Sequence, residues 1–546
     1  MTANNRLWYR KAIFYELNVR AFYDSDGDGC GDLRGAALKL DYLKTLGVDC
    51  IWLLPIYPSP LRDDGYDISD FYHIHEQFGS LDDLKALVDG AHQRGIRVIL
   101  DLVLNHTSDQ HPWFQAARAD RNSPYRDYYV WSDTGTEYSG ARIIFIDTEK
   151  SNWTWDEVAG QYFWHRFYST QPDLNYDNPQ VREEMKRVMA FWLDLGVDGF
   201  RADAVPYLFE REGTNCENLP ETHAYLKEIR RFIDENYPGR ILLCEANQWP
   251  EDVFPYVGTG DEFQMAFHFP VMPRMYMSIR QGDRTPLVWI MSRTPAISKS
   301  SQWCIFLRNH DELTLEMVTP EEREWMWAEY APDPRMRLNL GIRRRLAPLL
   351  DNDRRKINLA HSLLFSMPGT PIIYYGDEIG MGDNIWLPDR NGVRTPMQWA
   401  NTTNAGFSTA APSELYAPVI DTQPYDPAHV NVEDELRDPD SLLNFVAGLV
   451  KVNKAHMAFG EGDFEWADCE NTAVAAYFRT YQAEDAQETI LIVNNLSAEA
   501  QDVTIPLPQP AQKAPVDLLN DQALPGAGQA QLALHLDPYQ FYWLKL

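Results

Sequence analysis

Cysteine is scarce in this chain, which has six among 546 residues, at positions 30, 50, 216, 244, 304 and 469. Their spacing matches neither a metal-ligand set nor a redox pair. The chain also lacks an apolar run long enough to span a membrane, and its N-terminus lacks the apolar core of a signal peptide. We therefore expect a reduced, cytoplasmic protein that has no membrane partner.

Positive charge is also in short supply. Lysine and arginine number 49 against 80 aspartates and glutamates, so the formal net charge is −31. Such a surface keeps a protein soluble but repels phosphate backbones and anionic membranes. The composition argues against a nucleic-acid partner and favours a neutral small molecule as substrate, and it leaves a homo-oligomer open. The chain is too long for one compact core, so two or three domains are expected.

Short apolar runs rich in β-forming residues recur along most of the chain, each bounded by turn residues. Eight of them are predicted strands, at 12–19, 50–55, 97–103, 199–203, 241–245, 265–270, 304–310 and 370–376. Amphipathic helices are predicted between many of them, with clear N-capping residues for those over 80–95 and 178–196. Strands that alternate with helices favour a parallel sheet, and eight of them predict a (β/α)8 TIM barrel.

One predicted helix covers residues 33–47. It keeps Leu38, Tyr42 and Leu46 on one stripe, and Gly47 follows as a stop signal. This pattern predicts a single helix whose stripe faces the barrel.

Two connections are longer than ordinary loops, and they follow the third and seventh predicted strands. Residues 105–176 are rich in aromatic side chains and include a β-like run at 141–147, so we expect an inserted domain over the barrel mouth. From about residue 457 short strands and Pro/Gly turns predict a C-terminal antiparallel β-sandwich. The barrel is expected at 1–104 and 177–456, with a subdomain at 312–358. The inserted domain is expected at 105–176 and the C-terminal domain at 457–546.

Three acidic residues, Asp203, Glu245 and Asp311, each close an apolar strand-like run. In a parallel barrel the carboxyl ends of the strands meet on one face, where the active sites of such barrels lie. Any one of the three could be a helix cap or a loop acid, but together they favour chemistry. Two carboxylates that flank a glycosidic bond can cleave it, one as nucleophile and the other as acid and then base. The neighbouring Arg201 and His310 are expected in the same site, and the spacing leaves the role of each carboxylate open.

Five segments carry a resemblance to a known family. They read DLVLNH, GFRADAV, LLCEA, FLRNHDE and QPDLNY, at 101–106, 199–205, 242–246, 306–312 and 171–176. They resemble the main sequence regions of the α-amylase superfamily of glycoside hydrolases and transglycosylases. The resemblance implies that Asp203 is the nucleophile, Glu245 the general acid/base and Asp311 the stabiliser of the transition state. It also implies a site for the glucosyl ring, made of Asp63, Tyr66, His106, Arg201, His310 and Arg394.

Within the superfamily the chain resembles the trehalose synthases, which are maltose α-D-glucosyltransferases, almost from end to end. The segment 341–357 is the most discriminating, and 376–399 is shared in part with related α-glucosidases. The implied reaction isomerises maltose to trehalose by a retaining double displacement, with minor hydrolysis, in a pocket that excludes water. Arg142 and Asn247 are candidates for holding the second glucose, with a surface or structural role as the alternative for each. The sequence leaves two roles open for four aromatic residues, as walls of the pocket or as packing within the inserted domain. These residues are Trp153, Trp155, Trp164 and Phe167.

The main alternative function is that of an α-glucosidase or oligo-1,6-glucosidase, which uses the same machinery with water as the acceptor. A sucrose-isomerising enzyme is a further alternative of the same kind. A non-catalytic sugar-binding or transporter-associated relative would lack one of the carboxylates or carry a membrane span. The sequence fits neither condition, so an enzyme acting on a small α-glucoside is expected.

An acidic loop at 24–32, DSDGDGCGD, has the ligand order of a calcium loop. The predicted ligands are four carboxylates and one backbone carbonyl, from Asp24, Asp26, Asp28, Asp32 and Cys30. Position 12 of the loop is Gly35 where an EF-hand has a glutamate, so the loop is not an EF-hand. We expect Ca²⁺ or Mg²⁺ here because close carboxylates repel one another without a cation, and a solvated acidic turn is the alternative.

The resemblance implies a second metal site, a structural Ca²⁺ that ties the inserted domain to the barrel. Asn105 and Asp173 match its ligands in relatives, and backbone carbonyls near Tyr207 and Leu208, with Glu210, would complete it. Hard oxygen ligands of this kind suit Ca²⁺.

Overall fold

The computed structural model describes residues 7–546 apart from 485, 512 and 527. Its centre is a closed barrel of parallel strands in the spatial order β1-β14-β10-β9-β8-β7-β3-β2. These strands are β1 (Phe14–Leu17), β2 (Cys50–Leu53), β3 (Arg97–Val103), β7 (Gly199–Asp203), β8 (Ile241–Cys244), β9 (Met265–Phe267), β10 (Gln302–Phe306) and β14 (Thr370–Tyr374). Each contains the apolar core of one predicted segment, so the predicted (β/α)8 barrel is confirmed.

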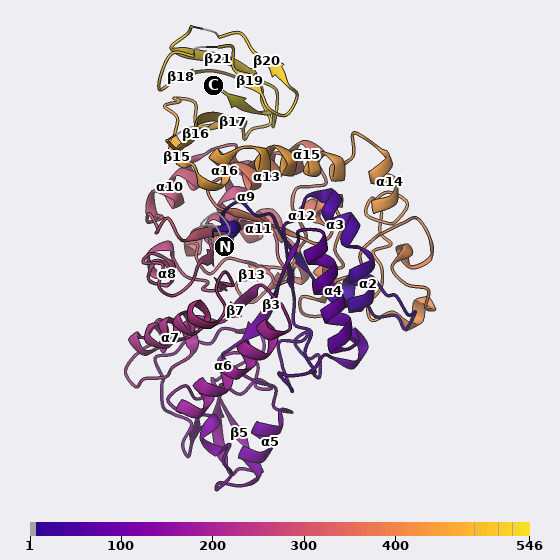
Figure 1. Cartoon of the computed structure of the whole chain (residues 1–546), viewed down its shortest axis with the longest axis vertical. Coiled ribbons are helices and arrows are strands. Elements are labelled where there is room, and N and C mark those ends of the chain that lie inside the picture. The colour runs from indigo at the N-terminus through magenta and orange to yellow at the C-terminus, as the bar shows by residue number, and fades with distance from the viewer. Residues whose placement is uncertain (1–6, 485, 512, 527) are drawn as a thin grey trace.

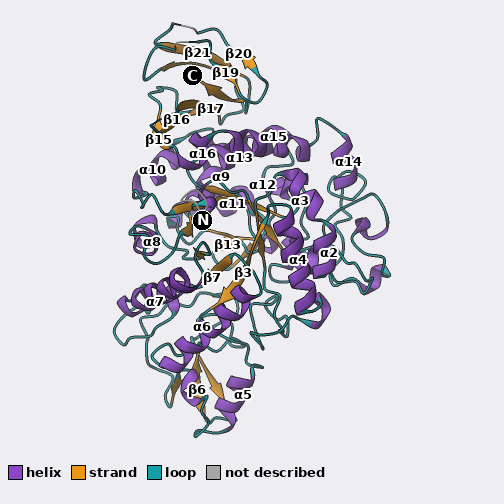
Figure 2. Cartoon of the chain, viewed as in Figure 1, coloured by secondary structure: helices purple, strands orange, loops and turns teal. Residues whose placement is uncertain are grey.

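Helices surround the barrel (Figure 2). They are α1 (Val19–Phe22), α2 (Leu33–Leu38), α3 (Leu40–Leu46), α4 (Leu81–Gln93), α6 (Pro179–Asp194), α7 (Pro220–Asn236), α8 (Pro250–Val257), α9 (Val271–Gln281), α10 (Thr285–Arg293), α12 (Leu346–Leu349), α13 (Arg354–Ser366) and α15 (Leu442–Ala455). The buried residues of α4, α6 and α7, for example, are mainly apolar. As predicted, α4 opens with a capping box and α6 with the side chain of Asn178 as its N-cap.

The prediction of one continuous helix over 33–47 is wrong. The chain breaks at Lys39 into α2 and α3, which shifts the phase of the apolar face, so Leu38 is 68% exposed. The ammonium group of Lys39 lies over the aromatic rings of Tyr23 and Trp399, at 3.9 and 4.1 Å. Contact with these two rings is a tertiary interaction that the helical periodicity does not reveal.

The inserted domain leaves the barrel after β3 and holds α5 (Pro112–Ala119) and a small antiparallel sheet. Its strands are β4 (Trp131–Ser132), β5 (Trp153–Asp156) and β6 (Gln161–Trp164). The run 141–147, which we predicted to be β-like, is not a strand. Its backbone closes turns instead, such as the bond from the Thr148 amide to the Phe145 carbonyl. Ile144 and Phe145 pack inward against Ala204 and Tyr207, whereas Ile146 is 47% exposed.

The second insertion follows β10 and forms a small subdomain. It consists of α11 (Pro320–Tyr330) and an antiparallel sheet of β11 (Leu313–Thr314), β12 (Arg337–Leu338) and β13 (Gly341–Ile342). Both insertions leave the barrel from the carboxyl ends of its strands, as β3 and β10 are parallel. They therefore stand on the face where the predicted carboxylates lie.

The C-terminal domain and the inserted domain lie at opposite ends of the long axis (Figure 1). After α14 (Val432–Arg437), α15 and α16 (Met457–Glu461), the chain forms β15 (Asp463–Trp466), β16 (Val474–Gln482), β17 (Gln487–Asn495), β18 (Gln501–Pro506), β19 (Val516–Asp517), β20 (Gln522–Ala523), β21 (Gln531–Leu536) and β22 (Phe541–Lys545). A six-stranded sheet and the β18–β21 pair share one hydrophobic core, which is the predicted sandwich. In the described part of the chain no helix is both long and apolar enough to cross a membrane.

Candidate active site

One cavity at the carboxyl ends of the barrel strands brings the three predicted carboxylates together. Asp203 is the last residue of β7 and Glu245 follows β8 directly, whereas Asp311 lies in the loop after β10 rather than at the strand end. The cavity is lined by Asp63, Tyr66, His106, Ile144, Phe145, Phe167, Asp203, Glu245, Asn247, Phe269, Asn309, His310, Asp311, Glu312, Thr314, Glu316 and Arg390. Acidic groups and apolar walls therefore face the same small space, which suits a neutral ligand rich in hydroxyl groups.

Arg201 is the cation that holds the nucleophile candidate and the acid candidate in place. Its guanidinium is buried and donates from Nη1 to Asp101 Oδ1 at 2.7 Å and to Asp203 Oδ1 at 2.5 Å. Its Nη2 pairs with Glu245 Oε1. The other oxygen of Glu245 accepts from the backbone amide of Ala204 at 3.0 Å. These bonds orient both carboxylates toward the cavity.

The pKa values of the two carboxyls differ in the way that acid–base catalysis requires. Burial raises the pKa of Asp203 to about 6, because Arg201 offsets only part of the desolvation. Burial raises the pKa of Glu245 further, to about 8, and the nearby charges of Asp203 and Asp311 add to the shift. Near neutral pH Asp203 is therefore mainly ionised and Glu245 mainly protonated, which suits a nucleophile and a general acid.

Asp311 is held as an anion by two arginines. Burial opposes its ionisation, but His310, Arg390 and Arg394 outweigh burial, so its pKa lies well below the usual range. Arg390 Nη1 and Arg394 Nη2 donate to Asp311 Oδ1 at 2.7 and 3.1 Å, and Arg394 Nε donates to the carbonyl of His310 at 2.8 Å. The second oxygen of Asp311, Oδ2, lies 3.2 Å from His310 Nε2, and Asp311 lines the cavity.

Four of the six residues that the resemblance assigns to the glucosyl ring line the cavity, namely Asp63, Tyr66, His106 and His310. The other two, Arg201 and Arg394, are not among the lining residues and pair with the lining carboxylates of Asp203 and Asp311. Tyr66 donates from its hydroxyl to Asp101 Oδ2 at 3.1 Å, and its ring stacks on that of His310 at 5.2 Å between centroids. His106 contacts the carbonyl of Tyr66 through Nε2 at 3.2 Å. The alternative role of Tyr66 as core packing holds in part, because the side chain is 94% buried yet still lines the cavity.

Asp63 also lines the cavity, and its carboxylate contacts Arg390. Its Oδ1 accepts from Arg390 Nη2 at 2.6 Å and its Oδ2 from Gln171 Nε2 at 2.8 Å. Burial nevertheless raises the pKa of Asp63 to about 7. A carboxyl of this kind can accept a hydrogen bond from a sugar hydroxyl or donate one to it.

The two candidates for the second glucose lie differently. Asn247 lines the cavity, donates from Nδ2 to Thr314 Oγ1 at 3.0 Å, and has no partner for Oδ1 among the described residues. Arg142 is not among the lining residues. It lies behind them and donates to Glu316 Oε2 at 2.7 Å and to Glu217 Oε1 at 2.8 Å. It therefore orients the cavity wall at Glu316.

Of the four aromatic residues left open by the sequence, Phe167 lines the cavity. Trp153 and Trp164 are buried in the core of the inserted domain, where their rings pack at 5.0 Å. Trp155 is 44% exposed on the outer surface. Packing within the inserted domain thus accounts for the two buried tryptophans, and neither belongs to the cavity.

Sequence reasoning missed several lining residues, of which Arg390 matters most. It joins Asp63 to Asp311 and its guanidinium lies 5.4 Å from the ring centre of Phe145. The other lining residues that were not predicted are Ile144, Phe145, Phe269, Asn309, Glu312, Thr314 and Glu316. Arg390 stands in the segment 376–399, whose resemblance to relatives was the one signal that could have drawn attention to it.

The residues proposed for the structural calcium fit a cation. Asn105 Oδ1, Asp173 Oδ2 and Glu210 Oε1 are buried and have no hydrogen-bond partner among the described residues. Burial raises the pKa of Asp173 to about 8 and that of Glu210 well above its usual value. Unpaired buried oxygens are costly, so an oxygen-seeking cation would satisfy all three at once. Tyr207 and Leu208 lie nearby in sequence, at the end of the 3-10 helix η5 (Val205–Tyr207).

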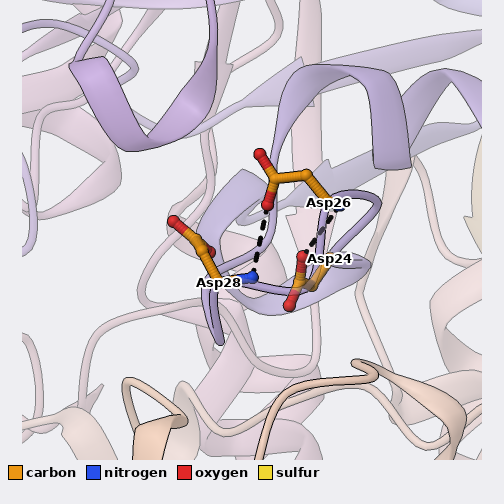
Figure 3. Close-up of side chains that lie close together, drawn as sticks. All are labelled: Asp24, Asp26 and Asp28. Carbon is orange, nitrogen blue, oxygen red and sulfur yellow. Dashed lines mark hydrogen bonds between the residues drawn. The ribbon is translucent and has the colours of Figure 1, made fainter.

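The acidic loop at 24–32 brings three of its carboxylates together (Figure 3). Oxygens of Asp24, Asp26 and Asp28 lie within 4.8 Å of one another, and the loop offers only oxygen donors of the kind that suit Ca²⁺ or Mg²⁺. Asp32 lies outside this group, because its carboxylate caps α2 by accepting from the Gly35 amide at 2.7 Å. Cys30 donates its backbone amide to Asp28 at 2.8 Å.

Two family models match the chain, and together they follow the two parts of the fold. The α-amylase catalytic domain matches residues 17–329 and 342–462, and the C-terminal domain of maltogenic amylase matches residues 464–543. The first covers nearly all of the barrel, the inserted domain and the second insertion except residues 330–341. This match shows that the chain carries an α-amylase catalytic domain.

Curated proteins and solved structures match along nearly the whole chain. Trehalose synthase/amylase TreS of Mycobacterium tuberculosis is 58% identical over 543 residues, which cover 99% of this chain and 90% of that protein. Oligo-1,6-glucosidase of Parageobacillus thermoglucosidasius is 32% identical, with 92% of each chain covered. The trehalulose synthase MutB of Pseudomonas mesoacidophila superposes with a TM-score of 0.79 at 29% identity, covering 98% of this chain and 99% of its own. A variant of MutB has been solved with the substrate sucrose.

The identity to the trehalose synthase is nearly twice that to the oligo-1,6-glucosidase over a similar span, and the three predicted carboxylates line one cavity. The chain belongs to the α-amylase family and groups within it with the trehalose synthases.

Proposed function

We propose that this protein isomerises maltose to trehalose by moving a glucosyl unit within one substrate molecule. The observation that carries the proposal is the cavity in which an ionised Asp203, a protonated Glu245 and an arginine-held Asp311 face one another. Membership of the trehalose synthase group supports the choice of substrate.

In the first step the carboxylate of Asp203 attacks the anomeric carbon of the non-reducing glucose. The glycosidic bond breaks as Glu245 gives its proton to the leaving oxygen, so a glucosyl ester and a free glucose form. Asp311, held as an anion, stabilises the positive charge that develops on the sugar ring and accepts hydrogen bonds from its hydroxyls.

In the second step the freed glucose turns over within the cavity. Its anomeric hydroxyl loses its proton to the carboxylate of Glu245 and attacks the anomeric carbon of the glucosyl ester, which releases the carboxylate of Asp203. Two inversions at the same carbon retain the α configuration, and the product is the α,α-1,1 disaccharide. No water is consumed, so the cavity must hold the glucose and exclude the solvent.

The walls of the cavity are suited to this task. Ile144, Phe145 and Phe167 of the inserted domain supply apolar surface that excludes water. Asn247, Glu312 and Glu316 supply polar atoms at the other side, where a second sugar would need hydrogen bonds. We propose that these three residues hold the freed glucose and that Arg142 acts on it through Glu316.

The experiment that tests the function is incubation with maltose in the presence of excess free glucose labelled with ¹³C. Intramolecular transfer predicts trehalose without label, read by proton and carbon NMR. Labelled trehalose would show that the freed glucose leaves and another enters. Glucose as the only product would replace the proposal with the alternative.

That alternative is an α-glucosidase, in which water takes the place of the freed glucose. The similarity to the oligo-1,6-glucosidase favours it as the second candidate. The same carboxylates serve both reactions, so the partition depends on how well the cavity walls exclude water. We propose that hydrolysis is the minor reaction.

We further propose that a structural Ca²⁺ binds at Asn105, Asp173 and Glu210, with backbone carbonyls of Tyr207 and Leu208. The unpaired buried oxygens of the first three residues support it. A second cation, Ca²⁺ or Mg²⁺, is proposed at the acidic loop 24–32. Scarce, buried and unpaired cysteines support a reducing, cytoplasmic location.

A further inference from the structure

A buried glutamate that the proposed mechanism does not use lies directly behind His310. Glu16 is fully buried on β1, inside the barrel. Its Oε1 lies 3.0 Å from the backbone nitrogen of His310 and 2.5 Å from Nδ1 of the same residue. Its Oε2 is also buried and has no hydrogen-bond partner among the described residues. One oxygen of Glu16 thus serves two atoms of His310.

The other ring nitrogen of His310 faces a carboxylate. Nε2 lies 3.2 Å from Asp311 Oδ2. Asp311 is ionised beside Arg390 and Arg394, so its oxygens can only accept hydrogen bonds. The contact is favourable only when Nε2 carries a hydrogen.

Burial keeps the imidazole ring neutral, since it lowers the pKa of His310 well below its usual value. A neutral imidazole has one N–H, and if Nε2 carries it, Nδ1 is a bare lone pair. The group that faces Nδ1 must then be a donor. Yet the same Glu16 oxygen must also accept from the backbone N–H of His310.

Only a protonated carboxyl satisfies both demands with one atom. Its hydroxyl oxygen donates to Nδ1 and accepts from the backbone amide. An ionised Glu16 would leave a charged oxygen, Oε2, buried without a partner, which is costly. Burial also raises the pKa of Glu16 well above its usual value, helped by the charges of Asp311 and Asp101 and opposed by Arg201.

We infer that Glu16 is a positioning residue: as a neutral acid it donates to Nδ1 of His310 and thereby fixes the tautomer that carries its hydrogen on Nε2, toward Asp311 and the substrate. The ring is also fixed in orientation, because Tyr66 stacks on it at an interplanar angle of 8° and Trp52 meets it edge-on at 5.8 Å. The active site thus contains a donor directed at the sugar hydroxyls beside Asp311.

The direct test is the tautomer of His310 in the complete protein, read from the ¹⁵N chemical shifts and ¹⁵N–¹H couplings of its ring. The His310 signals are identified by their loss in a His310→Asn variant. The expected result is a protonated Nε2 and an unprotonated Nδ1 near neutral pH. A proton on Nδ1 alone, or on both nitrogens, would overturn the inference even if no variant were made.

Glu16→Gln tests the role of the hydroxyl oxygen. A glutamine oxygen can accept from the His310 amide but cannot donate to Nδ1, and a glutamine nitrogen can donate but cannot accept. The ring should therefore switch to the tautomer with hydrogen on Nδ1. Because Nε2 then no longer donates, kcat/KM for maltose should fall about 10- to 150-fold, the usual scale for the loss of one hydrogen bond that involves a charged group.

Glu378→Gln is the matched control. Glu378 is equally buried, outside the cavity, and its Oε1 only accepts, from the hydroxyls of Tyr15 and Tyr42 at 2.7 and 2.6 Å. A glutamine oxygen can replace it, so both the tautomer of His310 and kcat/KM should stay unchanged. If Glu16→Gln leaves the tautomer as in the natural protein, Glu16 does not fix it. The expected fall in kcat/KM rests on the proposed function, whereas the expected tautomer of His310 does not. An unchanged tautomer therefore counts against the inference, and a changed tautomer with unchanged kcat/KM counts against the proposed function.

Discussion

The backbone amide of Asn339 donates to the Asp147 carboxylate at 2.7 Å, and the side-chain oxygen of Asn339 accepts from the backbone amide of Asp147 at 3.4 Å. This reciprocal pair joins the inserted domain to the subdomain after β10, across 192 residues of sequence. Asn339 also donates from Nδ2 to Glu312, a lining residue, at 3.3 Å. Asp147 ends the loop that carries Ile144 and Phe145, so the pair fastens one wall of the cavity to the other.

Loosening this pair should favour hydrolysis over isomerisation. Asn339 has a φ of 49°, which glycine adopts without strain, so Asn339→Gly removes the side chain and keeps the turn. The variant keeps the backbone bond to Asp147 but loses the two side-chain bonds of Asn339, to the Asp147 amide and to Glu312. Such bonds contribute about 0.5–1.5 kcal/mol each, so the closed arrangement should weaken by roughly 5- to 150-fold. The share of glucose among the products of maltose should rise, as measured by NMR, while total turnover changes less. Asp147→Ala should act in the same direction.

Asn352→Gly is the control for that substitution. Asn352 has a φ of 54° in the turn before α13 and is exposed, away from the cavity. It should leave the glucose share as it is in the natural protein. An unchanged share in both Asn339→Gly and Asp147→Ala would mean that the pair does not hold the cavity shut.

The rate should depend on pH through the two catalytic carboxyls. Activity requires an ionised Asp203, so kcat/KM should fall as the pH drops through about 6. It also requires a protonated Glu245, so kcat/KM should fall as the pH rises through about 8. The profile for maltose is thus expected to be bell-shaped with its maximum near neutrality.

Glu245→Gln separates the two limbs of the profile. With an aryl glucoside whose leaving group needs no proton, the variant should form the glucosyl-enzyme and show only the acid limb, which belongs to Asp203. Retention of the alkaline limb in this variant would assign that limb to another group.

In Asp203→Asn neither isomerisation nor hydrolysis should remain, because the glucosyl ester cannot form. Normal turnover in a pure sample would exclude Asp203 as the nucleophile.

Much of this site follows from local patterns in the chain. Asp203 and Arg201 lie on one strand whose alternation places both side chains in the barrel, and Glu245 follows a strand of the same kind. The barrel itself follows from the regular succession of strands and helices. These features can be predicted from the sequence because each depends on a few neighbouring residues.

Other parts of the site depend on contacts that no local pattern contains. Arg390 lies in an irregular segment, 79 residues beyond the Asp311 that it pairs with. Glu16 looks like any residue of a short buried strand until His310, 294 residues later, is placed against it. The loop at 141–147 resembles a strand by composition, but its Ile144 and Phe145 pack against residues that follow β7 rather than in a sheet. Long-range packing decides all three.

Removal of the proposed structural calcium should destabilise the protein. A ligand at 100 times its Kd contributes about 2.7 kcal/mol to the free energy of unfolding, so chelation should lower the melting temperature and added Ca²⁺ should restore it. Asp173→Asn removes one of the unpaired carboxylates and should abolish this dependence. Scanning calorimetry with verified metal content measures both effects.

Asp26→Asn shows which metal site is responsible for the change. Asp26 belongs to the exposed acidic loop, so its variant should keep most of the response to chelation. Loss of the response in Asp26→Asn rather than in Asp173→Asn would assign the stabilising cation to that loop. An unchanged melting temperature after complete metal removal would discard the structural role altogether.

Arg390 offers a test of how the charge of Asp311 is maintained. Its planar guanidinium donates to Asp63 and Asp311 at once, which the single ammonium of a lysine cannot reproduce in the same geometry. Arg390→Lys should therefore lose at least one charge-assisted hydrogen bond, worth about 1.5–3 kcal/mol, and kcat/KM should fall about 10- to 100-fold. The pKa of Asp311 should rise toward its usual value of about 3.9. This value lies below the acid limb that Asp203 sets near pH 6, so the limb should stay in place.

Arg335→Lys is the control, because Arg335 lies over the exposed ring of Trp386 at 3.7 Å, outside the cavity, and pairs with Asp333. It should leave kcat/KM unchanged. If Arg390→Lys also leaves kcat/KM unchanged, the double contact of Arg390 with Asp63 and Asp311 does not support activity.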